Sequence, residues 1–169
     1  EHLIRAELCH EAIRLTALLV EHPAGNQAQT HALLALMLLN GARLTARLDS
    51  DGNILRLEEQ NRLQWDKPMI ARGLYHLMVS TGAVQASEYH LQAAIAACHC
   101  AAEDYRSTDW PRILSLYDRL LELDDSPIIA LNRAVAVANV HGPRAGIDAV
   151  EAIGDLKQLN GYHLLYTVL

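Results

Sequence analysis

The chain has 169 residues, with 14 basic against 20 acidic side chains and a formal net charge of −6. This balance argues against a surface dedicated to nucleic acid or to an anionic membrane. Three cysteines without a regular spacing argue against a disulfide scaffold and favour a reducing compartment, and no apolar run is long enough to cross a bilayer. Ala and Leu are abundant and Phe is absent, so we expect a cytoplasmic, all-α protein.

Two helices are predicted before residue 48. The first spans about residues 3–20, and Pro23 marks its end. Its expected buried stripe consists of Leu8, Ala12, Leu15 and Leu19. The second spans about residues 28–47 and is apolar nearly all round over residues 32–39, so we expect it to be central and buried. Gly41 predicts a close helix contact or a weak point in this helix.

Residues 48–66 interrupt the helical pattern and predict a long inserted loop. Loops longer than about a dozen residues are often functional, and a ligand site is one interpretation. The interpretation we favour is a lid, packed through Ile54, Leu55, Leu57 and Trp65. Polar residues beside a large aromatic side chain can satisfy the buried backbone of such a loop, or can reach into a binding groove. The residues placed to do so are Gln60, Arg62, Trp65 and Asp66.

Two further helices are predicted in the middle of the chain. One opens at Asp66 and continues to about Thr81. The side chains expected to point inward are Ile70, Gly73, Leu74 and Leu77. The next helix runs from Ser87 to Ala102, and its small residues allow close approach of a neighbouring helix.

A helical hairpin is predicted at residues 109–138, with Asp109 and Ser126 as the two N-caps. The apolar stripes are expected at Trp110, Ile113, Leu114, Tyr117, Leu120 and Leu121, and at Ile128, Leu131, Val135 and Ala138. Pro143 follows Trp110 by 33 residues, close to the tetratricopeptide period of about 34 residues. Further helices are predicted at 143–152 and from Tyr162 onward. The fold expected is a single domain over residues 1–169, a right-handed stack of about eight helices in antiparallel hairpins.

Few residues indicate a catalytic or metal-binding role. Cys98, His99 and Cys100 are metal-binding types, but neighbours on a helix point apart and cannot jointly hold one ion. His99 with Glu103 can supply two ligands of a site completed from elsewhere, although helical histidines more often serve packing. Asn132 and Arg133 either face a groove or form a structural hydrogen bond to a neighbouring helix. No catalytic constellation, metal site or cofactor motif is predicted.

Six strings are similar to the C-terminal part of one bacterial group, the extracytoplasmic-function-type RNA polymerase sigma factors that carry a C-terminal tetratricopeptide-like domain. The strings are EEQNRLQWD (58–66), YHLQAAIAACHC (89–100), TDW (108–110), SPIIALNRAVAVA (126–138), GPRAG (142–146) and GYHLL (161–165). The resemblance covers essentially the whole chain. One departure is Asn61, which stands where the group commonly has an acidic residue.

The resemblance implies a non-catalytic regulatory domain of a longer protein, whose two sigma regions precede Glu1 and bind the polymerase and promoter DNA. The implied partners are those sigma regions and the RNA polymerase core, with DNA contacted only through the sigma regions. A domain that senses a small molecule is the alternative. No group of residues in the sequence indicates an enzyme. The candidate partner- or ligand-binding residues are Gln60, Arg62, Trp65, Asp66, Gln92, His99, Asn132, Arg133 and His163.

Overall fold

The computed structural model of the chain describes residues 5–82 and 85–154. These residues form seven α-helices, and the only β pairing among them is an isolated bridge between Leu48 and Ile54, so the all-α prediction is confirmed. None of the described helices combines the length and apolarity needed to cross a membrane. The chain divides into two compact units, with the boundary between Thr108 and Asp109. The single-domain, right-handed stack stays a prediction, and the helix expected from Tyr162 lies outside the described residues.

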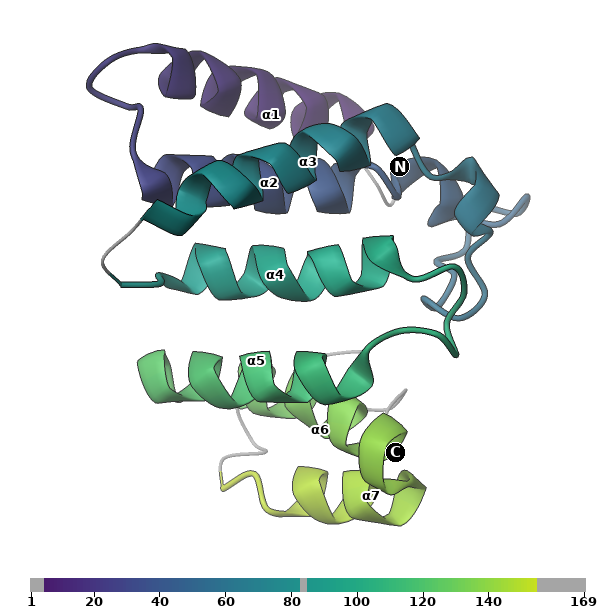
Figure 1. Ribbon diagram of the computed structural model, residues 1–169. Helices are drawn as coiled ribbons and strands as arrows, with labels where there is room; N and C mark the ends of the chain where they lie inside the picture. The colour runs from purple at the N-terminus through teal and green to yellow at the C-terminus, as the bar shows by residue number, and fades with distance from the viewer. Residues whose placement is uncertain (1–4, 83–84, 155–169) are drawn as a thin grey trace. The chain divides into compact units, whose positions relative to one another are not determined.

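The first unit is built around its second helix. It contains α1 (Ala6–Glu21), α2 (Ala28–Gly41), α3 (Lys67–Val79) and α4 (Glu88–Ala101), and α2 packs against the other three (Figure 1). Leu34, Leu38 and Leu39 of α2 are at most 1% exposed, which confirms the prediction of a buried central helix. The helix ends at Gly41, earlier than predicted. A short 3₁₀ helix, η1 (Leu44–Ala46), then leads into the loop.

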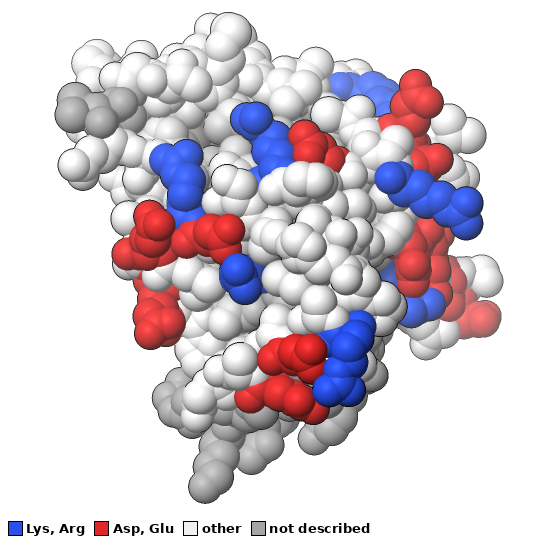
Figure 2. Space-filling model, turned by 60° about the horizontal axis from the view of Figure 1, so that its bottom comes forward, with Lys and Arg blue, Asp and Glu red and all other residues white. Residues whose placement is uncertain are grey.

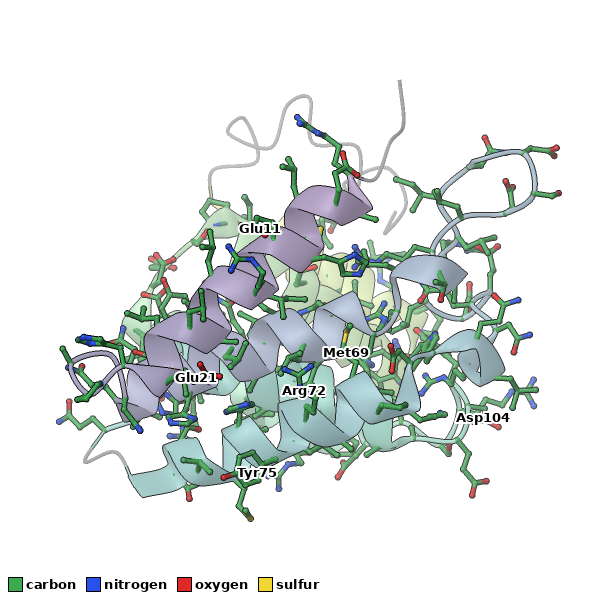
Figure 3. All side chains as sticks on the ribbon, turned by 90° about the horizontal axis from the view of Figure 1, so that it is seen from above. Glu11, Glu21, Met69, Arg72, Tyr75 and Asp104 are labelled. Carbon is green, nitrogen blue, oxygen red and sulfur yellow. The ribbon has the colours of Figure 1, made fainter. Side chains whose placement is uncertain are left out.

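The predicted stripe of α1 is wrong. The side chains of α1 that are buried belong to Ile13, Thr16 and Val20, whereas the predicted stripe of leucines faces outward. Leu8, Leu15 and Leu19 are 50%, 53% and 49% exposed. The physical reason is that α1 has apolar residues on two sides. Because α1 packs chiefly against α2, the side that faces α2 is the one that is buried. Figure 3 looks at the first unit from the side of α1.

Two glycines allow α2 to approach its neighbours. A Cβ added to Gly73 of α3 would lie 2.8 Å from Leu39 Cγ, and one added to Gly41 would lie 3.0 Å from Ile13 Cδ1. The predicted close helix contact at Gly41 is therefore confirmed. In α3, Ile70 and Gly73 are buried as predicted, but Leu74 is 38% exposed and was wrongly placed in the core.

The second unit contains α5 (Trp110–Leu123), α6 (Pro127–His141) and α7 (Pro143–Glu151), and α6 packs against both neighbours. Asp109 caps α5 as predicted, because its carboxylate accepts a hydrogen bond from Arg112 N at 3.0 Å. The buried residues of α5 are Trp110, Ile113, Leu116 and Leu120, three of which were predicted. Burial raises the pKa of Tyr117 to about 12, which fits its predicted inward position.

The predicted stripe of α6 is partly wrong. Ile128 is 44% exposed, and the buried residues are Leu131, Ala134, Ala136 and Val137. Leu131 and Ala134 form a core with Val150 of α7. This face of α6 is buried because α7 packs closely against it. A Cβ added to Gly146 of α7 would lie 2.5 Å from the Cβ of Ala138. Ser126 precedes the helix as predicted, but its side chain makes no capping hydrogen bond.

Candidate functional site

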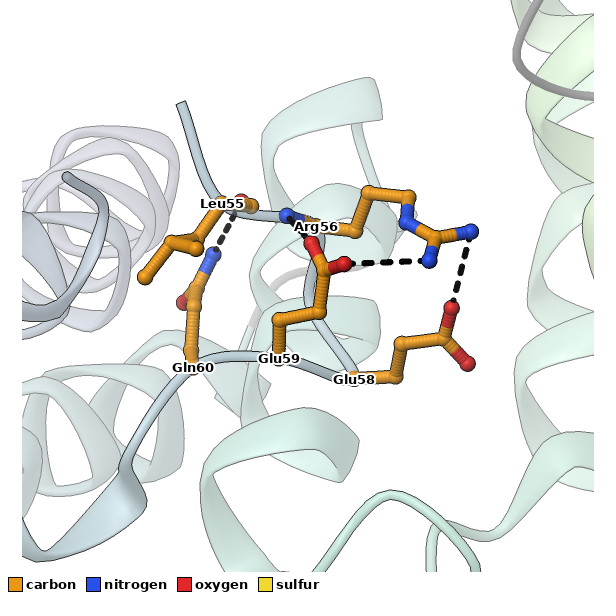
Figure 4. Close-up of polar contacts among 5 residues, drawn as sticks. All are labelled: Leu55, Arg56, Glu58, Glu59 and Gln60. Carbon is orange, nitrogen blue, oxygen red and sulfur yellow. Dashed lines mark hydrogen bonds and ion pairs between the residues drawn. The ribbon is translucent and has the colours of Figure 1, made fainter. Parts of the chain in front are cut away.

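The inserted loop is held together locally by its own side chains. Arg56 forms ion pairs with Glu58 at 3.1 Å and with Glu59 at 3.0 Å, and its backbone N–H donates to Glu59 as well (Figure 4). The hydrogen bonds from Arg56 lower the pKa of the Glu59 carboxyl. Gln60 Nε2 donates to the Leu55 carbonyl at 3.2 Å. These contacts bend residues 55–60 into a closed turn whose charged groups face solvent.

Trp65 anchors the end of the loop in the core of the first unit. The residue is 3% exposed and packs with Leu39, Ile70 and Ala96, while Leu57 packs against the same cluster. The packing predicted for the loop is therefore confirmed for Leu57 and Trp65. It is wrong for Ile54, which is 58% exposed.

Arg62 ties the loop to the end of α4. It is the first residue of the short 3₁₀ helix η2 (Arg62–Gln64), and only 8% of its surface is exposed. Its Nη1 donates to the carbonyls of His99 and Ala102, and its Nη2 reaches Thr108 Oγ1 at 3.4 Å. Carbonyls at a helix C-terminus lack partners within the helix and carry negative partial charge, so a guanidinium is well suited to cap them. Within the described structure Arg62 serves to fasten the loop.

Arg43 is a second buried arginine that sequence reasoning missed. It precedes η1 and is 8% exposed, and its Nε and Nη2 both lie 3.4 Å from Gln60 Oε1. The Cζ atoms of Arg43 and Arg62 lie 5.2 Å and 4.7 Å from the centroid of Trp65. Each contact has the geometry of a cation–π interaction. No pattern in the sequence marks Arg43, because its burial depends on the path of the loop that folds over it.

Burial is the main cause of the pKa shifts in this cluster, and the two cations modify them. Burial lowers the pKa of Arg43 to about 10, and the proximity of Arg47 and Arg62 adds to this effect. Burial, followed by Arg43 and Arg62, lowers the pKa of His99 to about 4, so that its imidazole is neutral at pH 7. Burial raises the pKa of the Cys100 thiol, whose Sγ lies 3.6 Å from the Leu39 carbonyl. The side chains of His99 and Cys100 therefore carry no negative charge that could neutralise the two arginines.

Two other candidates in the first unit make no side-chain hydrogen bond to this cluster within the described structure. Asp66 is the N-cap of α3: its carboxylate accepts from Met69 N at 2.8 Å, and its backbone N–H donates to Ala42 O at 2.9 Å. It holds the loop end in place as expected, through its backbone and as a helix cap. Gln92 is half-buried on α4.

In the second unit, Asn132 and Arg133 have different roles. Asn132 Nδ2 donates to Ile128 O at 2.9 Å within its own helix, so the alternative of a hydrogen bond from Asn132 to a neighbouring helix is wrong. Arg133 Nε lies 2.6 Å from Asp118 Oδ1 and joins α6 to α5. Arg133 also lines a groove of about 490 Å³, together with Asp125 of the α5–α6 connection and Ile153 beyond α7. His163 lies outside the described residues.

The described residues contain one close pair of histidines. His31 Nδ1 and His76 Nδ1 are 2.9 Å apart, and His31 Nε2 lies 3.1 Å from Asn26 Oδ1. Because the amide oxygen only accepts, His31 carries its proton on Nε2 and accepts from His76 Nδ1–H. Burial lowers the pKa of both rings. Within residues 5–82 and 85–154, no group of three or more His, Cys, Asp or Glu is arranged to hold a metal ion.

Acidic and basic side chains are intermixed on the face drawn in Figure 2. Exposed groups of opposite charge also form ion pairs along single helices. Examples are Arg14 with Glu11 at 2.7 Å and Arg144 with Asp148 at 3.0 Å. Such pairing leaves little unbalanced positive potential near these groups for a polyanion.

The structure thus brings together Gln60, Arg62, Trp65 and the backbone of His99. It adds Arg43 to this cluster, and the other described candidates are not part of it.

Residues 1–81 match a family of unknown function (DUF6596). The chain is also 42% identical, over 160 residues, to an uncharacterised protein of Rhizobium meliloti (strain 1021). The match includes 94% of this chain but 37% of that relative's length. No solved structure shows significant similarity to the chain.

Proposed function

We propose that the chain is a non-catalytic regulatory domain of a bacterial transcription initiation sigma factor. In this proposal it acts in the cytoplasm, by binding the sigma regions of its own full-length chain or the RNA polymerase core. The sigma-factor assignment rests on the six sequence strings described above. The chain matches little more than a third of its Rhizobium meliloti relative, which is compatible with further regions in a longer protein.

The observation that carries the interaction role is the outward face of α1. Leu8, Leu15, Leu18 and Leu19 are each about half exposed and lie within one sector of the helix. Their spacing is that of a buried stripe, yet no described element covers them. Exposed apolar patches of this kind mark protein–protein contacts more often than isolated surface leucines do. An amphipathic helix of the sigma regions is the occupant that we expect, since helix-on-helix packing buries such a stripe.

A pair of substitutions on this face tests the proposal. We expect Leu15→Ser with Leu19→Ser to weaken binding of separately expressed sigma regions at least about tenfold, because two central apolar contacts are lost. The thermal midpoint should change little, because both side chains are already half exposed. Leu63→Ser is the matched control, since Leu63 is 90% exposed and lies on η2 rather than on α1. Unchanged affinity in the double variant would remove α1 as the docking surface.

A second candidate function is the sensing of a small molecule that changes sigma activity. The groove of about 490 Å³ in the second unit favours it, because Asp125 and Arg133 place opposite charges beside apolar walls. Arg133→Met should abolish any ligand response that uses this groove. The same variant should leave binding of the sigma regions unchanged if the α1 face is the docking surface.

A further inference from the structure

The distribution of ion pairs over the arginines is unusual. Several exposed or half-exposed arginines of the described chain have a carboxylate partner, namely Arg5, Arg14, Arg56, Arg133 and Arg144. Neither of the buried arginines, Arg43 and Arg62, forms an ion pair with any described residue. Proteins normally show the reverse, because a charge removed from water needs a counter-charge more than an exposed one does.

Arg62 is compensated by the α4 carbonyls, but Arg43 is not. Of its five N–H donors, two share a single acceptor at 3.4 Å, Gln60 Oε1, and Nη1 has no acceptor among the described residues. The buried indole N–H of Trp65, whose ring both guanidinium groups contact, also lacks an acceptor within the described structure. The cluster of Arg43, Gln60, Arg62 and Trp65 therefore combines two positive charges with unused donors.

We propose that this cluster binds a small oxyanion, either inorganic phosphate or a carboxylate group, with Arg43 as its principal donor. Asp104 acts on Arg62 electrostatically without forming an ion pair with it, so a bound anion would supply what the cluster still lacks: a directly paired negative charge and acceptor oxygens for Arg43. The guanidinium fork matches two oxygens of a carboxylate or phosphate, and burial strengthens the interaction. Both arginines keep 8% of their surface exposed. The bound anion would join the loop, through Arg43 and Arg62, to α4.

Thermal unfolding of the 169-residue chain tests this proposal. Sodium phosphate and sodium acetate are each compared with sodium chloride at equal ionic strength and pH. At saturation we expect phosphate, acetate or both to raise the midpoint by on the order of 5 °C, since a ligand bound only by the native state stabilises it. A response to phosphate alone identifies a phosphate site, and a response to both identifies a site for oxyanions in general. Equal midpoints in all three salts overturn the proposal.

Two variants separate a specific site from a general salt effect. Arg43→Met should abolish the anion response, while its midpoint in chloride should not fall, because removing an uncompensated buried charge relieves a cost. Arg72→Met, which removes an exposed arginine on α3 that forms no ion pair with described residues, should keep the full response. If Arg43→Met does not fold, calorimetric titrations of the parent chain with phosphate and with acetate replace it, and the absence of binding in both refutes the proposal. An undiminished response in Arg43→Met refutes it equally.

Discussion

Arg62 shows how one side chain can hold a long loop. Replacing it with Met removes its hydrogen bonds to His99 O and Ala102 O and its stacking on Trp65, while most of the aliphatic volume is kept. We expect a loss of about 3 kcal/mol in the free energy of unfolding, because buried backbone carbonyls are left without a donor. Residues 48–61 should also become more sensitive to protease. Chemical denaturation and limited proteolysis measure the two effects.

Arg56→Met is the matched control for this prediction. Arg56 lies in the same loop and pairs with two carboxylates, but its side chain is 63% exposed. Exposed ion pairs contribute little, so its loss should be much smaller than that of Arg62→Met. Equal losses in the two variants would show that Arg62 has no special structural role.

His99 makes stability depend on pH. Its folded-state pKa is about 4, below the ordinary value of about 6.5, because burial and two nearby arginines disfavour the imidazolium. As pH falls below about 6.5, the unfolded chain therefore takes up a proton before the folded chain does. Stability should be complete above pH 6.5 and decline toward pH 4, by up to about 3 kcal/mol from this residue.

Unfolding of the parent and of His99→Gln across this pH range checks the expectation. The variant should show a flatter decline, because one group with a depressed pKa has been removed. His31 and His76, whose pKa values burial also lowers, should account for part of the remaining slope. A parent and a variant with parallel pH profiles would contradict the assignment to His99.

The sequence identified the fastening role of Gln60, Arg62 and Trp65, because polar groups beside an aromatic residue in a long insertion must satisfy that insertion. It did not identify Arg43, whose partners lie 17 and 22 positions further along the chain. Nor did it show that His99 contributes its carbonyl rather than its ring. Which arginine becomes buried is decided by the three-dimensional path of the loop, and no local periodicity encodes that path.

At the scale of elements, the helices were predictable and some of their faces were not. The boundaries of α3, α4, α5 and α7 lie within about two residues of expectation, because caps and prolines are local signals. For α1 the apolar pattern admits two faces, and the choice between them depends on where α2 lies. In α6 the face was chosen by Gly146 of α7, which the pattern of α6 alone does not contain.

The approach of α3 to α2 through Gly73 gives a test of packing. In Gly73→Ala, the new Cβ would meet Leu39 Cγ at 2.8 Å, and Leu39 is fully buried and has little room to move. The overpacking cost exceeds the gain in helix propensity, so we expect a net loss of about 1 kcal/mol or more. Gly82→Ala is the control, because nothing lies within 4 Å of its added Cβ. A Gly73→Ala variant as stable as the parent would mean that the two helices can separate without cost.

Trp110 is expected to hold the second unit together from the first turn of α5. The residue is 8% exposed and begins a buried row that continues through Ile113 and Leu120. Trp110→Ala should cost about 3–5 kcal/mol, as other large truncations in cores do. Leu123→Ala removes an apolar side chain from the same helix that is 53% exposed, and should change the thermal midpoint much less. Similar midpoints for the parent and Trp110→Ala would place this ring outside the core.

At the scale of the whole molecule, the exposed features of each unit and the net charge lead to the same conclusion. The two units expose an apolar stripe on α1 and a groove beside α6, both of which suit a protein or small-molecule partner. The chain carries six more acidic than basic residues, and the two deepest arginines are enclosed rather than presented to solvent. Among the described residues, this balance of charge gives no indication of the clustered cations on which nucleic-acid binding depends.

We therefore expect the 169-residue chain not to bind duplex DNA, even at low salt, where electrostatic attraction to phosphates is strongest. A binding protein neutralises several phosphates with Lys or Arg on one surface, and here exposed arginines such as Arg14 and Arg144 are already paired with carboxylates. A fluorescence titration with duplex DNA, run beside one with the separately expressed sigma regions of the proposed full-length chain, measures both affinities under the same conditions. Binding to the sigma regions without binding to DNA is the expected result. Micromolar binding to DNA that weakens steeply with salt, with none to the sigma regions, would reverse the proposed role.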